Sequence, residues 1–292
     1  MDPTPLILLF RESRRICAAV HPGLSGKNIL FSVARGRFIL YRKAKQAGHV
    51  GDMPSASHDA SRPRRAVSTQ NSTGEVPQLS LSRTMFVLPC SGQKSRSAST
   101  SQGPSLVDFL SRELARELMT QRARNAERAC VDESTLARAI DRYDGTLYEI
   151  ARFAIDELIA KGAHVLVLSG GYGVVLATEP IGMYEARFRN SMWPDRVVER
   201  CLAEYASKTG ITTVVGILSG STGYAQAFRR TRWPSTLSQV LLVTPQRGTG
   251  AMVKAPRAQG EALVSIAASG KLGERWRSTD DLAMEIVRIE TS

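Results

Sequence analysis

Short apolar runs that each lead into a Ser-Gly turn occur three times along the chain. A run of this length that is partly β-branched and closed by glycine predicts a strand buried on both faces, as strands of a parallel sheet are. The runs are Phe86–Leu88, Val165–Leu168 and Val214–Leu218, and the turns after them are Ser91-Gly92, Ser169-Gly170 and Ser219-Gly220. One Ser-Gly dipeptide means little, but three copies in the same position favour a site.

Apolar residues recur at helical spacing between these runs. We expect a helix from Pro104 through Leu118, a shorter helix that begins at Asp132, and a helix that ends at Phe228. Further helices are expected over 147–161, 190–207, 257–269 and 279–288, and a fourth strand over 240–243. Strands that alternate with helices predict an α/β fold, with a mostly parallel central sheet covered by helices on both faces.

Residues 1–84 show no sustained period. Residues 28–41 can pair as two short strands, whereas 46–82 are rich in Ser, Pro, Gly and Arg with few apolar anchors. Such a composition buries too little apolar surface to order itself. The sequence therefore predicts a weakly structured or disordered arm over 1–84 and an α/β domain over 85–292.

The charge of the chain is concentrated in this arm. The 292 residues carry a net charge of +12, and residues 1–84 hold 13 Lys and Arg against 5 Asp and Glu. The remaining residues hold 26 against 22, so the domain is only mildly basic. A basic arm suits nucleic acid, but an unselected upstream reading frame has the same composition.

Several classes of protein are disfavoured by what the sequence lacks. No apolar run is long enough to span a membrane, and no basic segment precedes the apolar stretch near the N-terminus, so we expect a soluble cytoplasmic protein. The four cysteines have no CxxC spacing, which disfavours a zinc knuckle and a disulfide framework.

Histidine, metal and dinucleotide chemistry are also disfavoured. His164 is the one histidine within 85–292, and it leads into a strand, so a Ser-His-Asp apparatus is not expected. The glycine-rich turns match neither G-x-G-x-x-G nor G-x-x-x-x-G-K-[ST]. We expect no metal and no cofactor.

The groups near the three turns fit a nucleobase or a sugar-phosphate. If the strands are parallel neighbours, the turns share one edge of the sheet and form one pocket. Tyrosines stack on a base, hydroxyls and amides hold phosphate, and a carboxylate activates water or stabilises an oxocarbenium ion. The candidate carboxylates are Asp144, Glu179 and Glu185; the other candidates are Ser91, Lys94, Tyr148, Ser169, Gly170, Gly171, Tyr172, Gly173, Tyr184, Ser219, Ser221, Thr222 and Tyr224.

Each carboxylate also has a purely structural interpretation. Asp144 can cap a turn. Glu179 stands before Pro180 and can be an ordinary exposed loop residue. Glu185 can pair with Arg187 or Arg189.

Four motifs follow one another along the chain: PCSGQK, then YDGTLY, then LSGGYGVV followed by PIGMY, and last VVGILSGSTGY. Over about residues 85–245 they resemble the YaaA-type family of peroxide-stress and DNA-binding proteins and the wider set that shares its LSGxYG turn. By matching position, the resemblance implies site roles for Cys90, Ser91, Lys94, Gly145, Tyr148, Ser169, Gly170, Tyr172, Gly173, Glu179, Tyr184, Ser219 and Tyr224.

The wider group resembles proteins with a uracil-DNA-glycosylase-like fold, among them phage-defence DNA glycosylases that remove glucosylated hydroxymethylcytosine. Family members of the YaaA type carry Arg directly after the Tyr, where this chain has Glu185. An acidic residue there is compatible with a catalytic offshoot.

Three functions follow as hypotheses. The first is a DNA N-glycosylase, in which Tyr172 and Tyr184 hold a modified base, and Asp144 or Glu179, with Glu185 third, acts at the sugar. The second is a stress protein that binds duplex DNA without breaking a bond, although such a protein would line its groove with Lys and Arg. The third is a free-nucleoside transferase. The partner implied is DNA, with no membrane, and the oligomeric state stays open.

Overall fold

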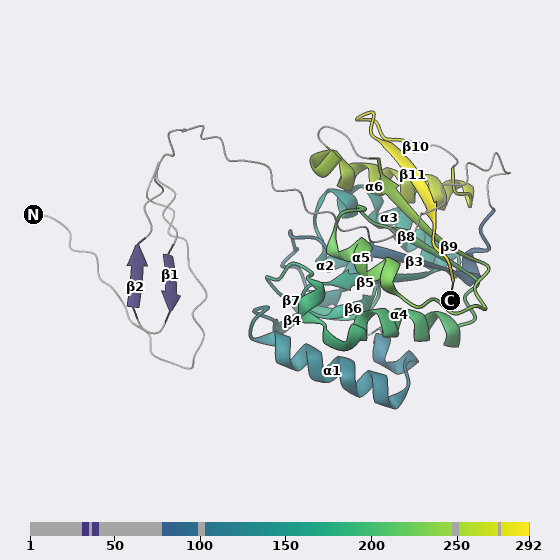
Figure 1. Ribbon diagram of the computed structural model, residues 1–292. Helices are drawn as coiled ribbons and strands as arrows, with labels where there is room; N and C mark the ends of the chain where they lie inside the picture. Colours follow the sequence, from purple (N-terminus) through teal and green to yellow (C-terminus); the bar gives the residue numbers. More distant parts are fainter. Residues whose placement is uncertain are drawn as a thin grey trace, which may run out of the picture. The chain divides into compact units, whose positions relative to one another are not determined.

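The computed structural model describes residues 31–34, 37–40, 78–98, 103–246, 251–273 and 276–291 (Figure 1). The chain divides into two compact units, Met1–Ser68 and Thr69–Ser292. In the first unit, β1 (Phe31–Ala34) and β2 (Arg37–Leu40) form an antiparallel hairpin. This hairpin confirms the two short strands expected within 28–41.

The ordered part of the second unit begins before Met85. The disorder expected over 46–82 concerns mainly residues outside the described part of the chain, but residues 78–82 are ordered. Leu79 is buried in the core, and its backbone N–H donates to the carbonyl of Gly270 at 2.9 Å. The Leu79 side chain packs into the hydrophobic core. This packing orders residues 78–82 although the segment before them is poor in apolar residues.

A seven-stranded sheet in the order β10-β11-β9-β8-β3-β5-β6 forms the centre of the second unit. The four middle strands are parallel, and the others are antiparallel to their neighbours. The strands are β3 (Thr84–Pro89), β5 (His164–Ser169), β6 (Gly173–Leu176), β8 (Thr213–Ile217), β9 (Gln239–Pro245), β10 (Trp276–Arg277) and β11 (Ala283–Arg288). The expected α/β class with a mostly parallel sheet is therefore confirmed.

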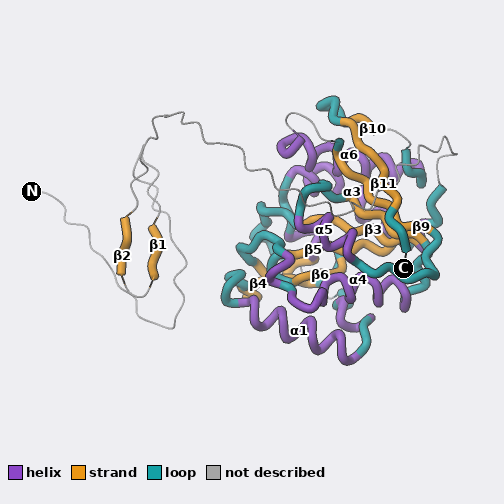
Figure 2. Tube along the Cα trace, in the orientation of Figure 1, coloured by secondary structure: helices purple, strands orange, loops and turns teal. Residues whose placement is uncertain are grey.

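Helices cover both faces of this sheet (Figures 1 and 2). One face carries α2 (Ala139–Arg142), α3 (Thr146–Ala160) and α6 (Ala251–Ser269), and the other carries α1 (Arg112–Ala126), α4 (Val197–Lys208) and α5 (Gly223–Arg230). Side chains of β3 alternate between the two layers: Phe86 and Leu88 pack under α3, while Met85 and Val87 pack on the opposite face.

Shorter elements connect these layers. They are the 3-10 helices η1 (Leu81–Arg83), η2 (Leu106–Phe109), η3 (Asn190–Met192) and η4 (Pro194–Arg196), and the antiparallel pair β4 (Asp132–Arg138) and β7 (Pro180–Met183). The helix expected from Pro104 is thus interrupted between η2 and α1. There Ser111 caps α1, because its side chain accepts a hydrogen bond from the N–H of Leu114.

Two expected helices are strands. The segment expected to start a helix at Asp132 is β4, and the helix expected over 279–288 is largely β11. Strand β11 pairs with β9 over its last five residues, with Met284 buried and Glu285 exposed. In so short a segment, pairing with an available sheet edge outweighs the weak helical spacing.

Strand β6 was not expected from the sequence, and it determines at which end of β5 residues 177–179 lie. After β5 reaches Ser169, the chain reverses through Gly170–Tyr172 and returns antiparallel, so that Leu176 pairs with Leu166. Gly173 has φ +75°, a conformation that favours glycine. Residues 177–179 therefore lie at the start of β5, away from the turn.

None of the helices in the described part of the chain is both long enough and apolar enough to cross a membrane.

Candidate functional site

The three Ser-Gly turns lie on one edge of the sheet. Strand β3 pairs in parallel with both β5 and β8, so the carboxyl ends of all three strands point the same way. We call the three turns, Pro89–Lys94, Ser169–Tyr172 and Leu218–Gly223, the rim. The expectation that Ser91, Ser169 and Ser219 share one rim is confirmed. Ligands of open α/β sheets bind in this position.

Side chains connect the turns of the rim directly. Cys90 Sγ lies 3.2 Å from the hydroxyl of Tyr224, which is on the first turn of α5. The hydroxyl of Tyr148 donates to the carbonyl of Pro89 at 2.8 Å, and that of Tyr184 donates to the hydroxyl of Tyr143 at 3.1 Å. Four tyrosines from three segments thus gather behind the turn that follows β3.

Most of this tyrosine cluster is closed to a ligand. Tyr143, Tyr148 and Tyr184 are 0%, 1% and 1% exposed. Burial raises the pKa of all three phenols well above the usual value, so all three hydroxyls stay protonated. Each therefore fixes the rim from behind, and no ring face of Tyr184 is open for an extruded base.

Tyr172 has a structural role as well. Its hydroxyl donates to Glu133 at 3.0 Å and accepts the backbone N–H of Gly182 at 3.0 Å, and the residue is 5% exposed. It joins the turn after β5 to the small sheet of β4 and β7. The placement of Tyr172 and Tyr184 as open stacking platforms is therefore wrong, because the core uses both rings.

The glycines of the turn after β5 allow close packing of the chain. A Cβ on Gly171 would lie 2.6 Å from the ring of Tyr184, and a Cβ on Gly170 would collide with the carbonyl of Ala186. In the same way, a Cβ on Gly145 would collide with the hydroxyl of Ser91. These positions need glycine because protein atoms, and not a ligand, approach them.

Lys94 lies at the edge of the tyrosine cluster. Its Nζ is 4.0 Å from the centre of the Tyr184 ring and donates to the carbonyl of Ser91 at 3.1 Å. Desolvation lowers the pKa of the ammonium, while the charges of Cys90 and Glu185 raise it; desolvation is the largest effect. Lys94 is thus a half-buried amine on the first turn of the rim.

Two of the three candidate carboxylates lie at the rim and are exposed. Asp144 follows Tyr143 beside the first turn: its N–H donates to the carbonyl of Gln93, and its carboxylate pairs with Arg152 at 3.2 Å. Glu185 follows Tyr184 and lies within electrostatic range of Lys94.

Glu185 does not form the ion pair that its neighbours in sequence allow. It takes part in none of the ion pairs found among the described residues. Its carboxylate therefore stays available to a ligand or to water.

The third carboxylate, Glu179, does not lie at the rim, which corrects the sequence-based placement. It follows β6 at the far end of β5 and is 3% exposed. Its oxygens accept from Ser105 Oγ, from the N–H groups of Leu106 and Leu176, and from Arg122 at 2.8 to 3.1 Å. A carboxylate with four donors, one of them the largely buried guanidinium of Arg122, holds the chain together and is not free to serve catalysis.

The loop after β8 opens into α5. Thr222 caps this helix: its hydroxyl donates to the carbonyl of Ser219 at 2.6 Å and accepts the N–H of Ala225. Ser221 is exposed, and Arg229 donates to the carbonyl of Gly220 at 2.7 Å. Helix α3 also starts at the rim, because Gly145 abuts Ser91. Two helix N-termini therefore face this edge, and both favour anions.

One buried hydroxyl beside this loop lacks a partner. Thr244, at the end of β9, is 2% exposed, and its Oγ1 makes no hydrogen bond in the described part of the chain. A Cβ on Gly220 would lie 3.0 Å from that oxygen. A buried polar atom without a partner is costly, so its place beside the rim points to an additional ligand or water there.

Sequence reasoning missed several of these residues. Tyr143 precedes Asp144 in the YDGTLY motif, but it was not among the predicted site residues, whereas Asp144 and Tyr148 of the same motif were. Thr244 and Arg122 carry no local pattern: the first ends a strand, and the second lies on a helix face of mixed charge. Only the three-dimensional fold brings Arg122 to Glu179 and Thr244 to the loop at Gly220.

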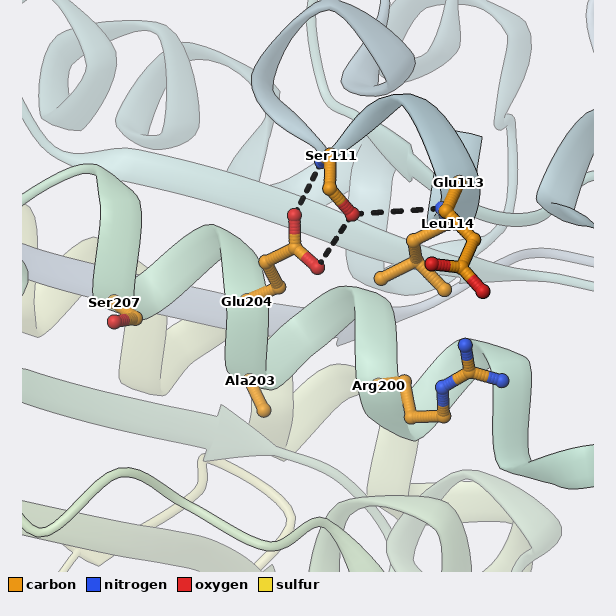
Figure 3. Close-up of a pocket in the computed structure, with 7 residues that line it drawn as sticks. All are labelled: Ser111, Glu113, Leu114, Arg200, Ala203, Glu204 and Ser207. Carbon is orange, nitrogen blue, oxygen red and sulfur yellow. Dashed lines mark hydrogen bonds between the residues drawn. The ribbon is translucent and has the colours of Figure 1, made fainter. Parts of the chain in front are cut away.

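Two hollows in the described part of the chain lie away from the rim. One of about 460 Å³ lies between α1 and α4, where Glu204 accepts hydrogen bonds from the backbone N–H and hydroxyl of Ser111 (Figure 3). Another of about 170 Å³ lies at the start of β5 and is lined by Phe109, His164 and Tyr205 among others. The first is wide and shallow, and its carboxylate is already bound, so neither replaces the rim as the candidate site.

The described residues contain no group of three or more His, Cys, Asp or Glu side chains that could hold a metal ion. In comparisons with known proteins, no family model matches the chain, and no curated protein matches it either.

Proposed function

We propose that this protein is a DNA glycosylase that hydrolyses the N-glycosidic bond of a modified base and leaves an abasic site. A base such as glucosylated hydroxymethylcytosine in phage DNA, met in the cytoplasm, is the proposed substrate. One observation carries the proposal: three strand ends and two helix N-termini lie at one edge of the sheet, together with Lys94 and two exposed carboxylates, Asp144 and Glu185.

The rim has groups for a phosphodiester. The starts of α3 and α5 favour negative charge, and the hydroxyls of Ser91 and Ser221 can donate to phosphate oxygens. Arg187, Arg189 and Arg229 are exposed on segments that flank the rim. Such arginines neutralise phosphates without reading sequence, and this supports a nucleic-acid ligand over a free nucleoside.

The carboxylates supply the chemistry. As the base leaves, positive charge develops on the sugar, and a fixed carboxylate stabilises that charge or takes a proton from the attacking water. Asp144 and Glu185 are both at the rim, and Glu185 is without an ion pair among the described residues. We therefore assign the role to one of these two and not to Glu179.

The base needs an aromatic partner other than Tyr172 or Tyr184. Tyr224 and Phe188 stack at 5.1 Å between ring centres with 18° between planes, and Tyr224 is half-buried. We propose that an extruded base binds beside this pair, next to the loop that carries Ser219 and to Thr244 at the end of β9.

The alternative is a DNA-binding protein that breaks no bond. The exposed arginines beside the rim support it as well as they support the enzyme. What favours the enzyme is the pair of exposed carboxylates, because negative charge beside a phosphodiester weakens binding unless it serves another purpose.

The test is a panel of duplexes that carry normal, hydroxymethylated or glucosylated cytosine. The full chain is incubated with each, released base is measured by mass spectrometry, and abasic sites are measured by alkaline cleavage. We expect base release from a modified duplex only. Binding to all three duplexes with no release would favour the binding protein.

A further inference from the structure

Lys94 is the basic side chain best placed for covalent chemistry at the rim. Its Nζ lies over the face of Tyr184 at 4.0 Å and is held by one hydrogen bond, to the carbonyl of Ser91. Among the ion pairs of the described residues, none includes Lys94. Lysines that only support a fold are commonly exposed or paired, as Lys161 is with Glu157 at 2.5 Å.

The surroundings of Lys94 make its ammonium easier to deprotonate than that of an exposed lysine. Burial against Tyr184 removes water from the ammonium and lowers its pKa, and this outweighs the opposing effects of Cys90 and Glu185. A neutral amine has a lone pair that can attack a carbonyl carbon, and desolvated lysines serve as Schiff-base nucleophiles for this reason. The arginines around the rim cannot do this, because a guanidinium stays protonated.

We propose that the Nζ of Lys94 forms a Schiff base with C1′ of an abasic deoxyribose and thereby gives the protein a strand-cleaving lyase activity. The inference rests on the proposed function, since an abasic sugar is the product of base excision. It adds a second reaction that the carboxylates alone cannot perform.

The reaction balances without any oxidant or reductant. The ring-opened abasic sugar carries an aldehyde at C1′; Nζ adds to this carbon, its protons pass to the oxygen, and water leaves as the C=N bond forms. A base then removes a proton from C2′, a C2′–C3′ double bond forms, and the C3′–O bond breaks, releasing the downstream strand with its 5′-phosphate. Water hydrolyses the imine and restores the amine.

A neighbouring carboxylate can take the C2′ proton. Glu185 lies within electrostatic range of Lys94 and is exposed, so an open sugar bound covalently to Nζ would lie beside it. Asp144 lies beside the same turn, where its backbone N–H donates to the carbonyl of Gln93. The carboxylates of the rim are therefore available to both reactions, base release at C1′ and removal of the proton from C2′.

The experiment traps the imine on a substrate that already lacks a base. The full chain is mixed with duplex DNA that carries one preformed abasic site, sodium cyanoborohydride is added, and the covalent protein–DNA adduct is measured on a denaturing gel. We expect an adduct with the parent protein and at least a 100-fold lower yield with Lys94→Arg, which keeps the positive charge but not the nucleophile. Lys161→Arg is the matched control and should form the adduct at the parent yield.

The two proposals fail separately in this design. An adduct on preformed abasic DNA with no base release from any modified duplex would retain the Schiff base and overturn the glycosylase. Base release without any adduct would do the reverse. A Lys94→Arg protein that is folded by circular dichroism and still traps at the parent yield would also overturn the inference.

Discussion

Carboxylates lie beside both ends of strand β5, exposed at one end and buried at the other. At the rim, Asp144 and Glu185 are exposed carboxylates, one paired with a surface arginine and one without an ion pair among the described residues. At the other end, Glu179 is 3% exposed and accepts four hydrogen bonds, one of them from Arg122. The difference shows that position and partners, and not residue type, separate a carboxylate that holds the fold from one that can act on a substrate.

The sharpest test of this contrast removes the buried carboxylate. Glu179→Ala leaves Arg122 buried without its partner and three donors unsatisfied, so we expect a loss of about 3–5 kcal/mol in the free energy of unfolding. Asp144→Ala, on the exposed side, should change it by no more than about 0.5 kcal/mol. Urea denaturation of both variants measures the two values; equal losses would remove the distinction.

Truncation tests where the second unit begins. A chain that starts at Thr69 should unfold at the temperature of the full chain and keep its activity on DNA. A chain that starts at Met85 loses the buried Leu79 and the start of β3, and we expect it to be less stable by about 2–5 kcal/mol, the usual cost of removing a buried leucine side chain. Equal melting temperatures for the two chains, measured by calorimetry, would show that Leu79 is not part of the core.

Much of the rim follows from sequence because its signals are local. Three apolar runs with glycine turns predict parallel strands, and parallel strands place Ser91, Ser169 and Ser219 together whatever the details of packing. The hairpin from β5 to β6 was not predicted, because its second strand has only four residues and follows a glycine-rich turn directly. That one omission moved Glu179 to the wrong end of the sheet.

Burial of the tyrosines could not be predicted in the same way. A tyrosine after a strand end can stack on a ligand or close a core, and its neighbours in sequence are the same in both cases. Tyr172 and Tyr184 close the core because the distant segments around Glu133 and Gly171 pack on them. Long-range contacts of this kind leave no period in the sequence.

A smaller effect tests the close packing behind the rim. Gly171→Ala places a Cβ 2.6 Å from the buried Tyr184 ring, which is held by its own hydrogen bond and by Lys94. We expect a loss of about 1–3 kcal/mol, typical of overpacking. Gly92→Ala is the control, since nothing lies within 4 Å of the added Cβ. Thermal denaturation of both variants would contradict this packing if Gly171→Ala melted no lower than Gly92→Ala.

The smallest effect concerns the link between two turns. Tyr224→Phe removes the hydroxyl that contacts Cys90 Sγ at 3.2 Å while keeping the ring that stacks on Phe188. We expect a loss of about 0.5–1.5 kcal/mol, the net value of one hydrogen bond, with the fold unchanged. Urea denaturation measures it, and an unchanged midpoint would mean that the contact contributes nothing to holding the rim together.

The central claim is that the exposed carboxylates of the rim carry the chemistry, and the rate of base release tests it most directly. Asp144→Asn, Glu185→Gln and the double variant are compared with the parent on glucosylated duplex DNA, at saturating protein and in a single turnover. Each amide keeps the shape of the side chain and removes its charge. We predict that one single variant and the double variant fall by about 10²–10⁴-fold while DNA binding persists, the range usual for a positioned acid–base group. A double variant that releases base at the parent rate would contradict the account.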